Sequence, residues 1–139
     1  MPWAGVVLWK GSGVGRLFCV QFDAKRQDWE LPKGRFEARL RYSSGVADSS
    51  LFATARWELW EEAGVWLSWR SRFLWVDPAG RRLKAPPRGN AWVVTSAAPE
   101  DEVCEDFAAR RWMTLVEFER HTSRRDHVAL LTSVASLLD

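Results

Sequence analysis

The clearest local signal in the sequence is a single helix. Ser49 or Ser50 is a suitable N-cap, apolar residues recur at helical spacing through positions 51–62, and Gly64 is placed to end the helix. We therefore expect a helix in the middle of the chain that begins after Ser49 or Ser50 and ends at Gly64.

Short apolar runs of strand length lie on both sides of this helix. They occupy residues 4–9, 16–22, 65–69, 73–76 and 91–95, residues 111–114 are also expected to be extended, and a second helix is predicted at 123–138. Pro32 and Gly34 are expected to stop any regular element before the central helix, and residues 35–50 to form an exposed loop. A chain of 139 residues that is 47% hydrophobic and 27% charged fits one domain, residues 1–139.

The sequence contains no candidate for a membrane-spanning helix. No stretch approaches the roughly 20 consecutive apolar residues that such a helix needs, and Lys10 and neighbouring glycines interrupt the first apolar run. Cys19 and Cys104 form no disulfide framework and have no partner at zinc-ligand spacing, so both are expected to be reduced thiols. We expect a protein of the cytoplasm without membrane contact, with the nucleus as the alternative compartment.

The central helix brings three acidic side chains together. Glu58, Glu61 and Glu62 stand at positions i, i+3 and i+4, so their carboxylates are predicted to project from one face. Because like charges at this spacing repel, a hard divalent cation such as magnesium would stabilise them, and it would accept waters and substrate phosphates as its other ligands. A solvated acidic helix face is the alternative interpretation.

Two motifs together resemble the Nudix hydrolase family. The family's box reads Gly, five residues, Glu, seven residues, Arg-Glu, an apolar residue, any residue, Glu-Glu, any residue, Gly and an apolar residue; residues 58–65 match its second half. A tryptophan leading into Leu-Pro-Lys-Gly usually precedes the box and is matched by residues 29–34, and Arg111-Trp112 before the terminal helix also agrees. The resemblance covers essentially the whole chain and implies an α/β (α+β) Nudix fold, with a mixed β-sheet sandwiched between helices.

The first half of the box departs from the family pattern. From Gly34 to position 57 there are 23 positions instead of 14, so nine residues are inserted. The box's first glutamate falls on Ser49, beside Asp48, and the box arginine is replaced by Trp57, while Arg56 points about 100° away around the helix. The resemblance implies that the missing pair braces the loop against the helix, so its loss removes a support and leaves the metal ligands in place.

The resemblance implies metal-dependent hydrolysis of a diphosphate linkage. Mg²⁺, or alternatively Mn²⁺, would be held by Glu58, Glu61, Glu62 and Gly34, with the three glutamates as catalytic carboxylates. A box glutamate or an acidic residue of the loop at 99–106 would accept a proton from the attacking water, and Glu105, together with Glu102, is the candidate in that loop.

Basic residues near the box suit an anionic small-molecule substrate. Within the family the sequence is most similar to the diphosphoinositol polyphosphate phosphohydrolase branch, which also takes diadenosine polyphosphates. Of 20 basic residues 16 are Arg, whose planar guanidinium makes bidentate contacts with phosphate. The candidates for substrate binding are Lys33, Arg35, Arg39, Arg41 and Arg111, with ordinary surface charge as the alternative.

Two other function classes remain open: a non-catalytic Nudix domain, and a domain that binds capped or single-stranded RNA through its arginines and exposed tryptophans. The altered box is compatible with a catalytically weak or inactive Nudix domain that binds a phosphorylated ligand, RNA or a partner protein. For the hydrolase, the only nucleic acid expected to bind is a capped-RNA substrate. The sequence leaves the oligomeric state open. Of ten tryptophans, Trp29 and the pair Trp66 and Trp69 are the candidates for base stacking, whereas most of the others are expected in the core.

Overall fold

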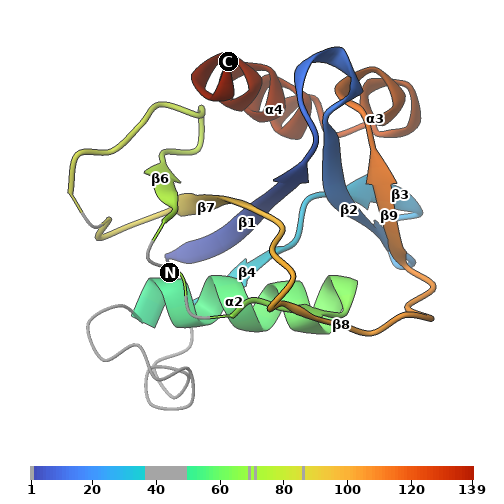
Figure 1. Cartoon of the computed structure of the whole chain (residues 1–139), viewed down its shortest axis with the longest axis horizontal. Helices are drawn as coiled ribbons and strands as arrows, with labels where there is room; N and C mark the ends of the chain where they lie inside the picture. Colours follow the sequence, from blue (N-terminus) through green and yellow to red (C-terminus); the bar gives the residue numbers. More distant parts are fainter. Residues whose placement is uncertain (1, 37–49, 69, 71, 86) are drawn as a thin grey trace.

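The computed structural model describes residues 2–36, 50–68, 70, 72–85 and 87–139 (Figure 1). Its elements follow in the order β1 (Trp3–Lys10), the 3-10 turn η1 (Gly13–Gly15), β2 (Leu17–Asp23), β3 (Asp28–Glu30), β4 (Lys33–Arg35), α2 (Ser50–Ala63), β5 (Val65–Trp66), β6 (Leu74–Val76), β7 (Ala91–Ser96), β8 (Glu102–Val103), β9 (Arg110–Met113), α3 (Leu115–His121) and α4 (Arg125–Leu138).

A mixed sheet forms the centre of the fold. Its main path runs β3-β2-β1-β7-β6, with β4 added to β1 and β9 added to β2, and β1 lies parallel to β7 while its other pairings are antiparallel. Helix α2 covers one face of the sheet, and α3 and α4 cover the other (Figure 1). The predicted mixed sheet between helices is therefore confirmed.

Strand β1 supplies side chains to both core layers. Ala4, Val6 and Leu8 face α2, whereas Val7 packs in the layer beneath α3 and α4. Successive strand side chains point to opposite faces, so an uninterrupted apolar run is what a strand buried on both sides requires. Trp92 of β7 fills the second layer and is only 2% exposed.

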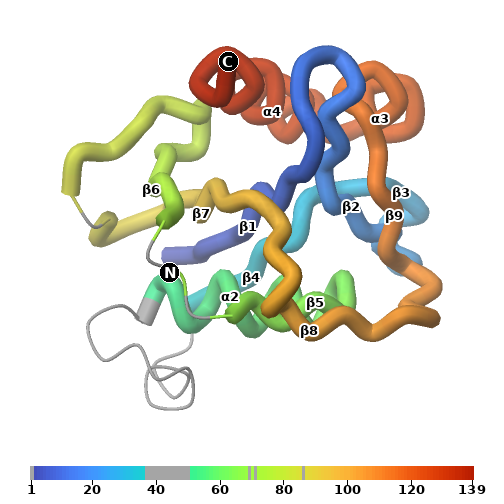
Figure 2. The backbone as a smooth tube through the Cα atoms, in the orientation of Figure 1, coloured from blue at the N-terminus to red at the C-terminus, as the bar shows by residue number. Residues whose placement is uncertain are grey.

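The segment from β3 to β4 enters a fork between β1 and β2. The two long strands pair only near their shared turn, where Trp9 lies opposite Phe18. Below that point β4 pairs with the start of β1 and β3 with the end of β2, and the Val6 amide donates to the Pro32 carbonyl at 3.0 Å (Figure 2). The prediction that Pro32 and Gly34 stop any regular element was wrong in part: Pro32 separates two short strands, and Gly34 lies inside the second.

Helix α2 confirms the central helix prediction. It spans Ser50–Ala63, and Gly64 follows with a φ of +68°, a left-handed conformation that favours glycine at a helix end. The Gly64 amide donates to the Trp60 carbonyl at 3.0 Å. The helix therefore ends where the sequence indicated.

Several boundaries differ from the sequence predictions, and one helix was not predicted. The strand expected at 65–69 is only two residues long, β5, and the last helix begins at Arg125 instead of 123. Helix α3 was not predicted, although Thr114 and Glu117 form a reciprocal capping box at its N-terminus that the sequence spells out. The helix is only seven residues long, too short to show a clear apolar period.

Cys19 is buried and Cys104 is exposed. Both cysteines are free, and burial raises the pKa of the Cys19 thiol to about 12. In the described part of the chain no helix has the length and apolar character needed to cross a membrane.

Candidate active site

Two of the three box glutamates converge beneath β4. The Glu58 carboxyl lies against the α carbon of Gly34, because a Cβ added at that glycine would stand 2.1 Å from Glu58 Cδ. Glu62, one helical turn later, accepts a hydrogen bond from the Lys33 amide at 3.2 Å through Oε1. The backbone of β4 thus lies directly over the C-terminal half of α2, and only glycine leaves room for the Glu58 carboxyl.

The two carboxyl groups interact with each other. Partial burial, a hydrogen bond to Glu58 and the Glu58 charge raise the pKa of Glu62 to about 9. Because the two carboxyls repel each other when both are ionised, neutralising their charge with a proton or a cation relieves the repulsion. Carboxylate oxygens next to a closely approaching main chain are the donor set that Mg²⁺ and Mn²⁺ prefer, so these residues fit such an ion.

Glu61 does not join this pair. Its side chain is exposed, and in the described part of the chain no group of three or more His, Cys, Asp and Glu side chains is placed to hold a metal ion. Around a helix, Glu61 is turned about 60° from Glu58 on the side away from Glu62, which explains the separation. The structure thus brings together Glu58, Glu62 and Gly34 of the predicted metal set.

A series of side-chain hydrogen bonds, not predicted from the sequence, continues from Glu62 across the sheet. Gln21 of β2 donates through Nε2 to Glu62 Oε2 at 2.7 Å and to Glu30 Oε1 at 3.0 Å. Glu30 Oε2 in turn accepts from Arg124 Nη1 at 3.0 Å, and Arg124 forms a two-point ion pair with Asp126. Gln21 stands out in the sequence as the polar residue inside an apolar strand, but nothing in the local pattern indicates its partners.

The predicted substrate-binding residues lie in different places. The Lys33 ammonium stands 4.8 Å from the centre of the Trp3 ring, and burial lowers the pKa of Lys33. Arg35 is exposed on β4, next to Gly34, while Arg39 and Arg41 lie outside the described residues. Arg111 is exposed on β9, with its guanidinium 5.8 Å from the centre of the Trp29 ring.

The acidic loop is attached to the C-terminal end of α2. The Cys104 amide donates to the Gly64 carbonyl at 2.8 Å, and Arg110 Nη1 donates to the Ala63 carbonyl at 2.9 Å. Glu102 lies in β8 and Glu105 in the turn after it, both exposed. The loop therefore follows the end of the helix that carries Glu62, and Glu105 is accessible to solvent there.

Comparisons with known proteins bear on the fold. No family model matches the chain, and no curated protein matches it at a significant level. Among solved structures it is similar to the Ap4A hydrolase of C. elegans, with a TM-score of 0.64 and 15% identity over 99% of this chain and 97% of that chain. It is also similar to RenU, a Nudix hydrolase of M. smegmatis, with a TM-score of 0.63 and 15% identity over 99% and 85% of the two chains. The chain has the Nudix fold.

A third similar structure is not described as a hydrolase. It is the C-terminal domain of mouse MUTYH in complex with human PCNA, with a TM-score of 0.61 and 15% identity over 98% of this chain and 88% of that chain. At such identity the likeness shows the Nudix fold alone.

Residues at and beside the divergent box positions of α2 contact the segment that follows the helix. Arg56 is buried, donates through Nε to the Leu67 carbonyl at 2.7 Å, and stacks 4.1 Å from the centre of the Trp66 ring. Trp57 and Trp60 each contact the same ring edge-on at 6.4 Å. These contacts occupy Trp66, which was a candidate for base stacking, and fix α2 to β5. Trp69, Asp48 and Ser49 lie outside the described residues.

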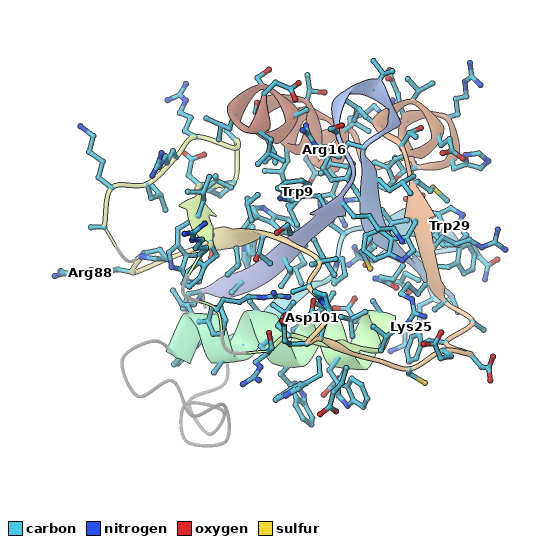
Figure 3. All side chains as sticks on the ribbon, in the orientation of Figure 1. Trp9, Arg16, Lys25, Trp29, Arg88 and Asp101 are labelled. Atoms are coloured by element: carbon cyan, nitrogen blue, oxygen red, sulfur yellow. The ribbon has the colours of Figure 1, made fainter. Side chains whose placement is uncertain are left out.

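Trp29 borders an open hollow of about 430 Å³. Phe22, Ala24, Ala108, Ala109 and Arg111 complete its lining, and Figure 3 shows Trp29 beside β9. Because Phe22 follows Gln21 in β2, the two side chains point to opposite faces of the sheet. The hollow therefore opens on the face opposite Glu62.

Proposed function

We propose that the chain is a metal-dependent hydrolase of diphosphate linkages in phosphorylated small molecules. The observation that carries the proposal is the pairing of Glu58 and Glu62 beside the Gly34 backbone, on a fold shared with solved Nudix hydrolases. Diphosphoinositol polyphosphates and diadenosine polyphosphates are the proposed substrates. The similar C. elegans protein is named an Ap4A hydrolase, which supports testing the second group first.

The carboxylates have distinct proposed roles. Glu58 and Glu62 would hold Mg²⁺ or Mn²⁺, together with the main chain at Gly34, and exposed Glu61 is the third candidate carboxylate. Such an ion, when bound, neutralises diphosphate oxygens and lowers the pKa of a coordinated water. Glu105, exposed in the turn after β8, is the proposed acceptor for the proton of the attacking water.

Basic residues near Gly34 and on β9 are proposed to bind the phosphates. Lys33 and Arg35 flank Gly34 in β4, so they precede and follow the residue against which Glu58 packs. Arg39 and Arg41 follow in the inserted segment. Arg111 lies beside Trp29 on the face of the sheet opposite Glu62, and it is proposed to contact a more distant part of the substrate. Arginine suits this role because its fork matches two phosphate oxygens at once.

A substrate screen tests the proposal. Purified protein would be incubated with diphosphoinositol polyphosphates, dinucleoside polyphosphates, nucleoside diphosphate sugars and capped RNA, with Mg²⁺ or Mn²⁺ or with a chelator. We expect release of phosphate or mononucleotide from at least one class, only with metal present. The Glu62→Gln variant is the control, since it removes one carboxylate at nearly constant shape. Metal-independent product release, or none from any class, would refute the proposal.

A binding domain without turnover is the second candidate function. The replacement of the box arginine by Trp57 and the similar MUTYH domain solved with PCNA favour it. In that case the chain would bind a phosphorylated ligand, RNA or a partner protein. Saturable binding of an intact diphosphate with no product after prolonged incubation would select this alternative over the hydrolase.

A further inference from the structure

We infer that Gln21 is a positioning residue for the proposed metal site: it orients Glu62 through a neutral amide and places no positive charge beside that carboxyl. The inference rests on the proposed function, because it concerns how one of the two proposed metal-holding carboxylates is kept in place. Gln21 touches no substrate in this proposal; it acts through Glu62.

Both amide hydrogens of Gln21 are used. Nε2 donates to Glu62 Oε2 at 2.7 Å and to Glu30 Oε1 at 3.0 Å, and Gln21 is only 4% exposed. Since the side chain lies between two carboxyl groups, only the nitrogen end of the amide can face them, because the oxygen end would be repelled. The orientation of the amide is thus determined by its surroundings.

Glu30 holds the amide from the other side. It lies opposite Gln21 in the pairing of β3 with β2, and its second oxygen accepts from Arg124 at 3.0 Å. Arg124 is in turn fixed by two hydrogen bonds to Asp126, at 3.1 and 2.9 Å. The order of contacts is therefore Asp126, Arg124, Glu30, Gln21 and Glu62, which connects the start of α4 to the proposed metal site.

The neutrality of Gln21 is the important feature. A lysine or arginine at this point would also donate to Glu62, but its charge would compete with a divalent cation for the same carboxylate. The guanidinium of Arg124 reaches Glu62 only through Glu30 and Gln21, and the ammonium of Lys33 stands over Trp3. The amide thus gives Glu62 a fixed orientation without a neighbouring ion that would offset its charge.

Direct Mn²⁺ binding tests this inference without relying on activity. Mn²⁺ would be titrated into wild type, Gln21→Met and Gln21→Lys by calorimetry and by loss of the free-ion electron paramagnetic resonance signal. Removing a hydrogen-bond partner of a metal-binding side chain commonly weakens affinity about 10- to 100-fold, and we expect that loss for Gln21→Met. Gln21→Lys should bind Mn²⁺ more weakly than Gln21→Met, although it retains a donor.

Two further variants keep the test decisive. Thr95→Val is the matched control, because Thr95 is a buried polar residue on β7 whose hydroxyl donates to Arg72 and not to the site. It should bind Mn²⁺ like wild type even if it unfolds more easily. Gln21→Asn retains the neutral donor with one methylene fewer, so it should fold and show an affinity between wild type and Gln21→Met.

The possible results separate the two hypotheses. Wild-type affinity in Gln21→Met and Gln21→Asn would overturn the positioning role, and wild-type affinity in Gln21→Lys would overturn the argument from neutrality. If wild type itself binds no Mn²⁺, the metal site of the proposed function fails. Weakened binding in the Gln21 variants with normal binding in Thr95→Val supports the inference.

Discussion

The Glu58 carboxyl packs so closely on Gly34 that a methyl group in place of the glycine hydrogen would stand 2.1 Å from Glu58 Cδ. The atoms that would clash belong to the end of a flexible side chain, so the carboxyl can move while the backbone stays where it is. This contact joins β4 to α2 at the point where the metal is proposed to bind. A change at Gly34 therefore acts on the site more than on the fold.

The first prediction follows from this contact. Gly34→Ala should displace the Glu58 carboxyl and weaken Mn²⁺ binding at least about tenfold, while the free energy of unfolding stays within about 1 kcal/mol of wild type. Calorimetric titration and urea unfolding would measure the two effects. Gly15→Ala is the control, because a Cβ at Gly15 meets nothing within 4 Å. Equal Mn²⁺ affinity in Gly34→Ala and wild type would show that the Glu58 position is unimportant.

Glu62→Gln should separate stability from turnover. We expect turnover to fall at least about a hundredfold, because a metal-binding charge is lost. The free energy of unfolding at pH 8 without metal should stay equal or rise, since Glu62 is ionised in the unfolded chain at this pH and folding raises its pKa, a cost that the glutamine does not have. Steady-state kinetics and urea unfolding test the pair of outcomes, and a variant that loses both activity and stability would contradict the assigned role.

The buried His127 should make the stability of the fold depend on pH. Its Nδ1 accepts from the Leu31 amide at 3.1 Å, and burial together with the nearby Arg124 charge lowers the pKa of His127 to about 4. The folded state therefore favours the neutral ring. The free energy of unfolding gained by keeping His127 neutral is fully present above the unfolded-state pKa of about 6.5. It is lost as the pH falls towards 4, and the loss amounts to roughly 3 kcal/mol.

Comparison with a variant isolates the His127 contribution. The raised pKa of Glu62 has the opposite effect, since it removes stability as the pH rises from about 4.5 to 9. His127→Gln can still accept from the Leu31 amide but does not titrate. Between pH 7 and 4.5 the difference in unfolding free energy between wild type and His127→Gln should shift against wild type. A constant difference would mean that His127 is not held neutral.

Arg39 and Arg41 of the inserted segment are predicted from the sequence to bind the substrate. If Arg39 and Arg41 contact the anionic substrate, changing both to Ala should raise KM much more than it lowers kcat, because such contacts are equal in the ground state and the transition state. The difference in KM should shrink at high salt, where exposed phosphate contacts are screened. An unchanged KM at low ionic strength would assign the segment no part in binding.

Local patterns predicted the parts of the site that lie on one element. Helix α2, its end at Gly64 and the neighbourhood of Glu58 and Glu62 follow from spacing within about 15 residues. Gln21, Glu30 and Arg124 could not be predicted in this way. Arg124 and Glu30 are 94 residues apart in the sequence, and they meet only because α4 starts beside β3 in the folded chain.

The separation of Glu61 from the Glu58–Glu62 pair has a different cause. Spacing at i, i+3 and i+4 places three side chains on one broad face, but the sheet covers only part of that face. β4 and β2 lie over Glu58 and Glu62, and Glu61 remains in solvent. Periodicity gives the angle around a helix, whereas the position of the neighbouring strands decides which carboxylates converge.

Turnover of diadenosine or inositol diphosphates with and without Mg²⁺, in wild type and in Glu58→Gln, is the most direct measurement of the central claim. Glu58→Gln keeps the packing against Gly34 and removes the charge. We predict that wild type releases product only with metal and that Glu58→Gln is at least about a hundredfold slower at saturating Mg²⁺. Equal rates in the two proteins, or product formation by wild type in excess chelator, would contradict the assignment of Glu58 and Glu62 as the metal site of a diphosphate hydrolase.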